Sequence, residues 1–165
     1  GFLDTEDRPI SHCFKVYPWE WLYRDDFARY LNEPDATRFI EPAWKVLLSS
    51  KAILPYLWQL NPGHPNLLPA SFQDDLGRPS VRKPVYSREG ENISILLAQS
   101  DISTDGLYAG EPVIYQAYAP LPSMAGSFPV IGSWVIGDAA AGIGIREDDG
   151  PITRNSSRFV PHYFL

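Results

Sequence analysis

The chain has 165 residues and a formal net charge of −6, with 14 lysines and arginines against 20 aspartates and glutamates. This length suits one domain with a core of its own. The acidic balance argues against non-specific nucleic-acid binding, which requires a basic face. No apolar run is long enough to span a membrane, and the single cysteine, Cys13, cannot form an internal disulfide. These features predict a cytoplasmic protein that binds neither nucleic acid nor membrane.

The first half of the chain has helical patterns and one short strand pattern. Residues 13–17 predict a strand, and residues 25–31 predict a helix with acidic residues in its first turn. The strongest helical stripe runs over residues 44–60 and contains Pro55. We therefore expect a kink, or two helices that meet near Ser50, whose hydroxyl suits the N-cap of the second helix.

Strand patterns dominate from residue 80 onward. Five segments rich in Val, Ile and Tyr predict strands: residues 81–87, 92–98, 113–118, 129–136 and 141–145. Gly137-Asp138 is a turn signal, so the last two segments predict a hairpin. The expected fold class is α+β, with residues 1–79 mostly helical and residues 80–165 forming a mainly antiparallel sheet with flanking helices.

Lys83 and the loop around Gly90 are the first two candidates for a binding site. Lys83 is flanked by β-formers just before the loop, where an inward ammonium group can neutralise phosphate. The plainer alternative, which spacing alone favours, is a solvated strand lysine. The loop over residues 87–92 can offer backbone N–H groups to a triphosphate, although it lacks the strand–loop–helix context of a P-loop. An ordinary hairpin turn with Gly90 at positive φ is the alternative.

Gln116 lies in a third candidate segment, residues 115–120. A strand that leaves a sheet edge with a glutamine and free backbone groups can recognise the amino edge of adenine. The alternative is an edge strand that Pro120 ends.

Arg146 follows an apolar strand, where an exposed charge is unexpected. An arginine at a strand end can hold a transferring phosphoryl group in a bidentate fork. The acidic run after it could pair with it or hold a cation; this run is Glu147, Asp148 and Asp149. A solvated acidic turn with a salt-bridged arginine is equally compatible with the pattern.

The histidines give no metal signal. His12, His64 and His162 have no metal-ligand spacing with one another or with Cys13. The sequence therefore predicts no metal-binding residues within this chain.

A series of short motifs runs along nearly the whole chain. In order they are residues 14–21 (FKVYPWEW), 40–45 (IEPAWK), 48–54 (LSSKAIL), 62–69 (PGHPNLLP), 83–84 (KP), 88–90 (REG), 132–134 (GSW), 142–147 (GIGIRE) and 157–162 (SRFVPH). Each motif is modest, but the ordered series is specific. It resembles the C-terminal stretch of the glutathionylspermidine synthase-like family of ATP-grasp acid–amine ligases.

The resemblance implies that residues 1–165 are the C-terminal portion of an ATP-grasp domain, incomplete relative to the full family fold. It implies a ligase that uses ATP and Mg²⁺ to activate a carboxylate as an acyl phosphate and couples it to an amine. Glutathione and a polyamine are the implied substrates.

Carried over position by position, the resemblance assigns roles to individual residues. The ATP contacts are Lys51 and Lys83, the loop over the phosphates contains Gly90 and Glu91, and the adenine-binding strand exit comprises Gln116, Ala117, Tyr118 and Ala119. Arg146 matches the catalytic arginine that stabilises the transferring phosphoryl group.

The Mg²⁺ ligands of the family are expected upstream of this chain, because residues 1–40 lack the family's Arg-x-Asp and Glu-x-Asn patterns. An isolated chain of this kind is then expected to be inactive. One alternative is a non-catalytic ATP-grasp remnant that acts as a nucleotide-binding or protein-interaction module. Another is an unrelated α+β structural domain.

Overall fold

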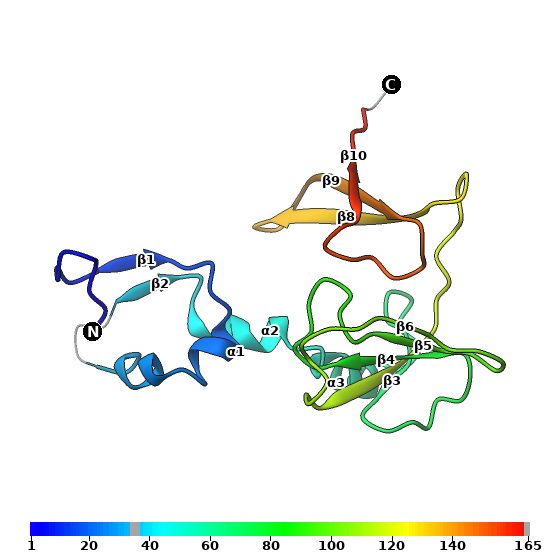
Figure 1. Ribbon diagram of the computed structural model, residues 1–165, viewed down its shortest axis with the longest axis horizontal. Helices are drawn as coiled ribbons and strands as arrows, with labels where there is room; N and C mark the ends of the chain where they lie inside the picture. The colour runs from blue at the N-terminus through cyan, green and yellow to red at the C-terminus, as the bar shows by residue number, and fades with distance from the viewer. Residues whose placement is uncertain (34–36, 164–165) are drawn as a thin grey trace. The chain divides into compact units, whose positions relative to one another are not determined.

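A computed structural model describes residues 1–33 and 37–163. The chain divides into two compact units, Gly1–Ile53 and Leu54–Leu165 (Figure 1). No helix within these described ranges is long and apolar enough to cross a membrane.

The first unit consists of short elements around aromatic side chains. Its elements are β1 (His12–Phe14), α1 (Trp19–Leu22), the 3-10 helix η1 (Asp26–Tyr30), β2 (Arg38–Ile40), the 3-10 helix η2 (Ala43–Lys45) and α2 (Val46–Ser49). The ring of Phe39 makes edge contacts with Phe2 at 5.3 Å and Trp19 at 5.2 Å between centroids. Strand β1 pairs in parallel with β2 over three residues and ends at Phe14, so the strand expected over residues 13–17 is shorter than predicted.

The helical stripe over residues 44–60 is interrupted at Ser50, as the sequence predicts. Helix α2 ends at Ser49, Ser50 adopts an extended conformation, and α3 (Ile53–Leu60) follows. The Ser50 hydroxyl accepts a hydrogen bond from the Ala52 amide at 3.3 Å, which supports its expected role at the start of the second helix. Pro55 is fully buried in the first turn of α3, where its missing N–H group costs no helical hydrogen bond.

The second unit contains a five-stranded antiparallel sheet. Its strands, in chain order, are β3 (Ala70–Ser71), β4 (Ser80–Pro84), β5 (Ser94–Leu96), β6 (Ile102–Ser103) and β7 (Val113–Ala117). Their spatial order is β3-β7-β4-β5-β6, so β7 lies between two partners. The alternative that residues 115–120 form an edge strand is therefore wrong.

The second unit also contains a three-stranded antiparallel sheet. Strands β8 (Phe128–Ile136) and β9 (Ala139–Asp148) form the predicted hairpin, and β10 (Arg158–Val160) pairs with the other side of β9 (Figure 1). Gly137 occupies the turn at φ 61°, which suits glycine. The mainly antiparallel, α+β character expected from the sequence is confirmed.

An apolar cluster lies on one face of the five-stranded sheet. Val81 on β4 faces Ile95 on β5 and Gln116 on β7, so these three side chains point to the same side. Ile152, from the segment between β9 and β10, packs on Val81 and Ile95. The segment that follows β9 therefore lies against the sheet face that carries Gln116.

Candidate functional site

Lys83 and Gln116 form a polar pair on this sheet face. Lys83 lies two residues after Val81 on β4 and so points to the same side. Its ammonium group donates a hydrogen bond of 2.7 Å to the side-chain oxygen of Gln116, which is buried. Burial lowers the pKa of Lys83, and no carboxylate among the described residues pairs with it. A desolvated cation with a neutral partner is a site where an anion binds favourably.

The strand exit after Gln116 uses two of its amide groups internally. The Ala117 amide donates to the Pro69 carbonyl at 2.8 Å, and the Tyr118 amide donates to the Pro79 carbonyl at 3.4 Å. Tyr118 also packs against the apolar cluster, while Ala119 is exposed. A base at this segment would therefore meet carbonyl oxygens or Ala119 rather than the first two amides.

The Gly90 loop packs closely against the segment after β9. Gly90 has φ 72°, and a Cβ atom at this position would overlap the Thr153 carbonyl oxygen. The Thr104 hydroxyl donates to the Gly90 carbonyl, and the Glu91 carboxylate accepts the Leu107 amide at 2.9 Å. The loop is thus tied down on both sides, and only glycine fits its tip.

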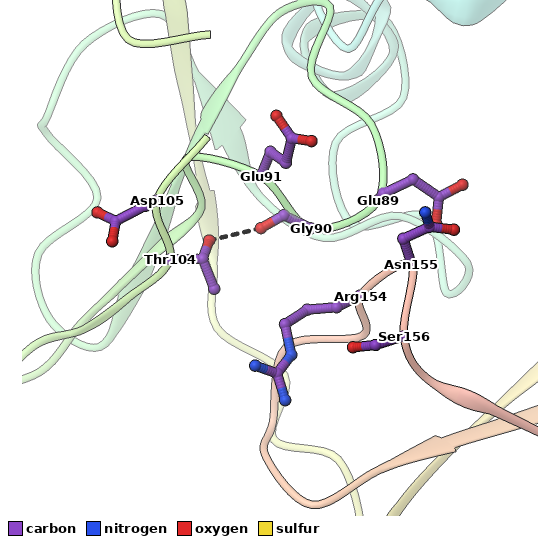
Figure 2. A pocket seen from close by; sticks show the side chains of 8 residues that line it. All are labelled: Glu89, Gly90, Glu91, Thr104, Asp105, Arg154, Asn155 and Ser156. Atoms are coloured by element: carbon purple, nitrogen blue, oxygen red, sulfur yellow. Dashed lines mark hydrogen bonds between the residues drawn. The ribbon is translucent and has the colours of Figure 1, made fainter. Parts of the chain in front are cut away.

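A cavity of about 380 Å³ lies beside this loop (Figure 2). Its lining residues are Glu89, Gly90, Glu91, Thr104, Asp105, Arg154, Asn155 and Ser156. The lining contains three carboxylates and one arginine, and that arginine is already paired with Asp148 at 2.8 Å. The lining is therefore more favourable to a cation than to a phosphate.

Arg146 is held near the end of β9 by three different groups. One terminal nitrogen donates to the Arg154 carbonyl, and the other lies 3.6 Å from a Glu89 carboxylate oxygen. The guanidinium group also lies over the Phe159 ring, 5.2 Å from its centroid. Its Nε atom is buried and has no hydrogen-bond partner in the described part of the chain. The fork is therefore oriented by its two terminal nitrogens, and its Nε donor is buried without a partner among the described residues.

The acidic run after Arg146 pairs with other arginines. Asp148 pairs with Arg154, while Glu147 and Asp149 pair with Arg158 at 3.2 and 2.8 Å. The possibility that these carboxylates pair with Arg146 is wrong, since Arg146 pairs with Glu89 instead. Three arginines and three acids within a short stretch allow many pairings, and only the fold selects among them.

Asp148 forms a network that sequence reasoning missed. Its buried carboxylate accepts hydrogen bonds from the Arg154 guanidinium at 2.8 Å, the Ser157 hydroxyl at 2.6 Å and the Gly150 amide at 3.3 Å. The hydrogen bond from Arg154, followed by that from Ser157, holds the pKa of Asp148 well below its usual range. The available signal was the run of Asn and Ser residues between two arginines, which suits a hydrogen-bonded turn.

Within the second unit, the structure brings Lys83 together with Gln116 and places the Gly90 loop beside Arg146 through Glu89. Lys51 belongs to the first unit, between α2 and α3, and its part in a shared ATP site stays a prediction. In the part of the chain that the structure describes, no group of three or more His, Cys, Asp or Glu side chains could hold a metal ion.

Comparisons with known proteins identify the family. The sequence pattern of the family described as "Glutathionylspermidine synthase preATP-grasp" matches residues 1–165. A Haemophilus influenzae protein named "Putative acid–amine ligase" is 45% identical over 99% of this chain and 44% of its own length. Trypanothione synthetase of Crithidia fasciculata is 36% identical over 96% of the chain and 28% of its own length.

A third relative is the bifunctional glutathionylspermidine synthetase/amidase of Escherichia coli, 32% identical over 96% of the chain and 30% of its own length. The chain thus spans less than half the length of these relatives. The family description names a preATP-grasp region, so the expected C-terminal, ATP-grasp position of the chain stays a prediction. The motif series and the match over all 165 residues agree that the chain belongs to the glutathionylspermidine synthase family.

Proposed function

We propose that this chain is the C-terminal, ATP-binding portion of an ATP-dependent acid–amine ligase. The names of its relatives, which are ligases and synthetases, support this class of reaction. In such a reaction ATP supplies the phosphoryl group that activates a carboxylate as an acyl phosphate, and an amine then displaces phosphate. Glutathione and a polyamine are the proposed acid and amine.

The observation that carries the proposal is the hydrogen bond between Lys83 and Gln116. The family resemblance assigned both residues to one ATP site, and their side chains meet at 2.7 Å although they are 33 positions apart. The Gln116 oxygen fixes the ammonium group without neutralising it. The desolvated charge of Lys83 is then compensated when a phosphate binds.

We assign the triphosphate to the Lys83 side of the Gly90 loop and not to the neighbouring acidic cavity. Glu89, Glu91 and Asp105 would repel phosphate in that cavity, whereas Lys83 precedes the loop on β4. Arg146 then serves as the catalytic residue that stabilises charge on the transferred phosphoryl group. The contacts that orient its terminal nitrogens support this role.

The described residues do not fit a magnesium ion, because they present no cluster of metal-binding side chains. We therefore place the Mg²⁺ ligands in a part of the full-length enzyme outside this chain and derive no step through the ion. Under this proposal an isolated chain with residues 1–165 binds ATP weakly and does not catalyse.

A test of the proposal measures product formation by the full-length protein. The protein is incubated with ATP, Mg²⁺, glutathione and spermidine, and ADP release is compared with amide formation by mass spectrometry. We expect one ADP for each amide during turnover, no amide when either the amine or the acid is omitted, and no ADP beyond a single turnover when the amine is omitted. Binding of ATP without turnover for any acid and amine would contradict the ligase proposal and favour the non-catalytic module.

A further inference from the structure

We propose that Asp148 is a positioning residue for Arg146, acting through the loop that joins β9 to β10. The proposal rests on the proposed role of Arg146 in phosphoryl transfer. Asp148 acts on Arg146 indirectly: it fixes Arg154, the loop residue whose carbonyl oxygen accepts a hydrogen bond from the Arg146 guanidinium group.

The argument starts from how Arg154 is held. Its guanidinium group donates twice to the Asp148 carboxylate, from Nη2 at 2.8 Å and from Nε at 3.4 Å. Its backbone amide donates to the Ser157 hydroxyl at 2.7 Å, and that hydroxyl in turn donates to Asp148 at 2.6 Å. Both the side chain and the amide of Arg154 are therefore fixed by one buried carboxylate.

The carbonyl of Arg154 is the group that this arrangement directs. It accepts the hydrogen bond from the Arg146 terminal nitrogen. Asp148 lies two residues after Arg146 on the same strand, so a rigid strand carries both the arginine and the carboxylate that fixes its acceptor. These contacts lead from Arg146 through Arg154 to Asp148 and back along β9. They set the orientation of the Arg146 fork more tightly than the contact with the partly exposed Glu89 does.

The loop is also clamped from the other side. The Thr153 carbonyl lies so close to Gly90 that a Cβ atom would not fit between them. Ile152 packs into the apolar cluster on the sheet face. Loss of Asp148 would therefore release the Arg154 end of the loop while residues 152 and 153 stay seated. We expect a local loss of Arg146 orientation rather than unfolding.

The test compares Asp148→Asn with Asp149→Asn in the full-length ligase. The two variants make the same chemical change one residue apart, but Asp149 is exposed and forms its ion pair with Arg158. We expect Asp148→Asn to lower kcat by roughly 10- to 100-fold, on the scale of a misplaced catalytic group, while KM for ATP changes far less. Asp149→Asn should keep normal kcat and KM.

The Arg146→Ala and Arg146→Ala/Asp148→Asn variants separate positioning from stability. If Asp148 acts through Arg146, the double variant turns over no more slowly than Arg146→Ala alone. Additive losses would overturn the positioning role. Normal turnover of Arg146→Ala would instead refute the proposed function of Arg146, which distinguishes the two failures.

Ser157→Ala provides a second variant in case Asp148→Asn does not fold. It removes the 2.6 Å hydrogen bond to Asp148 and the acceptor of the Arg154 amide but leaves the buried carboxylate paired with Arg154. We expect a smaller loss of kcat that is again absent in the Arg146→Ala background. Normal kcat in the folded Ser157→Ala protein would overturn the proposal.

Discussion

Lys83 lies on β4 inside the five-stranded sheet, and Arg146 lies near the end of β9 in the three-stranded sheet. Lys83 has one neutral partner, Gln116, and a pKa that burial lowers. Arg146 has a carbonyl, a carboxylate and an aromatic ring around it. The first environment favours binding of an anion, and the second fixes the direction of a charged fork.

Because of this difference, we expect Lys83 and Arg146 to have separate roles within one proposed site. A desolvated lysine gains interaction energy as soon as phosphate binds, so its loss should appear in affinity. An oriented arginine gains most when charge develops on the transferred group, so its loss should appear in turnover. The predictions below test that separation.

Arg146→Ala should have the largest effect. In the full-length enzyme we expect kcat to fall by roughly 10²- to 10³-fold, the scale of losing one transition-state donor, with little change in ATP affinity. Arg146→Lys should recover little activity, because the planar fork is lost while the charge stays. Steady-state kinetics and melting temperature should be measured on the same samples.

Arg158→Ala is the matched control for Arg146→Ala. Arg158 makes ion pairs with Glu147 and Asp149, and its side chain is half exposed. We expect near-normal turnover in this variant. Normal turnover of a folded Arg146→Ala protein would show that Arg146 has no role in the mechanism. It would also contradict the proposed division in which Lys83 acts on binding and Arg146 on turnover.

Lys83→Ala should have the next largest effect, and it should act on binding. We expect ATP affinity, measured by calorimetry on the full-length protein with Mg²⁺, to weaken by about 1–3 kcal/mol, the range for a charge-assisted contact. Lys51→Ala tests the second predicted contact in the same way. Lys45→Ala is the control, since Lys45 lies over the Trp44 ring and is not a predicted contact.

The pH dependence of binding sharpens the prediction for Lys83. Because burial lowers its pKa, Lys83 loses its proton below the ordinary lysine value of 10.5. ATP affinity should therefore fall as pH rises through that lowered pKa, and the Lys83→Ala protein should lack this decline. Unchanged affinity in both the Lys83 and the Lys51 variants would refute the ATP-site assignment.

The sequence predicted the parts of the fold that have strong local patterns. Long strands such as β8 and β9 carry many apolar residues, and Gly137 marks their turn. Strand β3 has two residues, too few for any period, and it pairs with β7 far along the chain. That non-local pairing makes β7 an interior strand, which Pro120 could not indicate.

The candidate site also has one part that the sequence predicted and another that it did not. The family resemblance assigned Lys83 and Gln116 to one site, and the fold brings their side chains together. The partners of Arg146 were not predictable, because Glu89 and the Arg154 carbonyl reach it only through the folding of two loops. Loop geometry of this kind depends on packing, such as the contact between Gly90 and Thr153, rather than on residue spacing.

Gly90→Ala should have a moderate effect that connects the two regions, because the loop follows β4, which carries Lys83, and its Glu89 pairs with Arg146. The new methyl group must displace the Thr153 carbonyl, and the alanine backbone must also adopt φ 72°. Gly77→Ala introduces the same strain at φ 74° in open space, so it isolates the steric part. We expect Gly77→Ala to destabilise the protein by about 1 kcal/mol and Gly90→Ala by more, measured by urea unfolding. Equal effects would contradict the close packing of the loop.

Glu89→Gln should have the smallest effect. The Glu89 carboxylate lies 3.6 Å from Arg146, and both side chains are partly exposed, so the pair contributes roughly 0.2–1 kcal/mol. In the proposed site the negative charge of this carboxylate lies near the phosphates and repels them. Its removal should therefore tighten ATP binding by up to a few-fold at low ionic strength, and the gain should diminish as salt screens the charges.

The matched control is Glu147→Gln, which removes a carboxylate that pairs with Arg158 instead. Calorimetry at low and high salt should show no comparable gain for this variant. The result that matters most is kcat of Glu89→Gln. If the Arg154 carbonyl orients Arg146, kcat stays near normal when Glu89 is neutralised. A loss as great as that of Arg146→Ala would mean that Glu89, and not the loop held by Asp148, sets the direction of the fork.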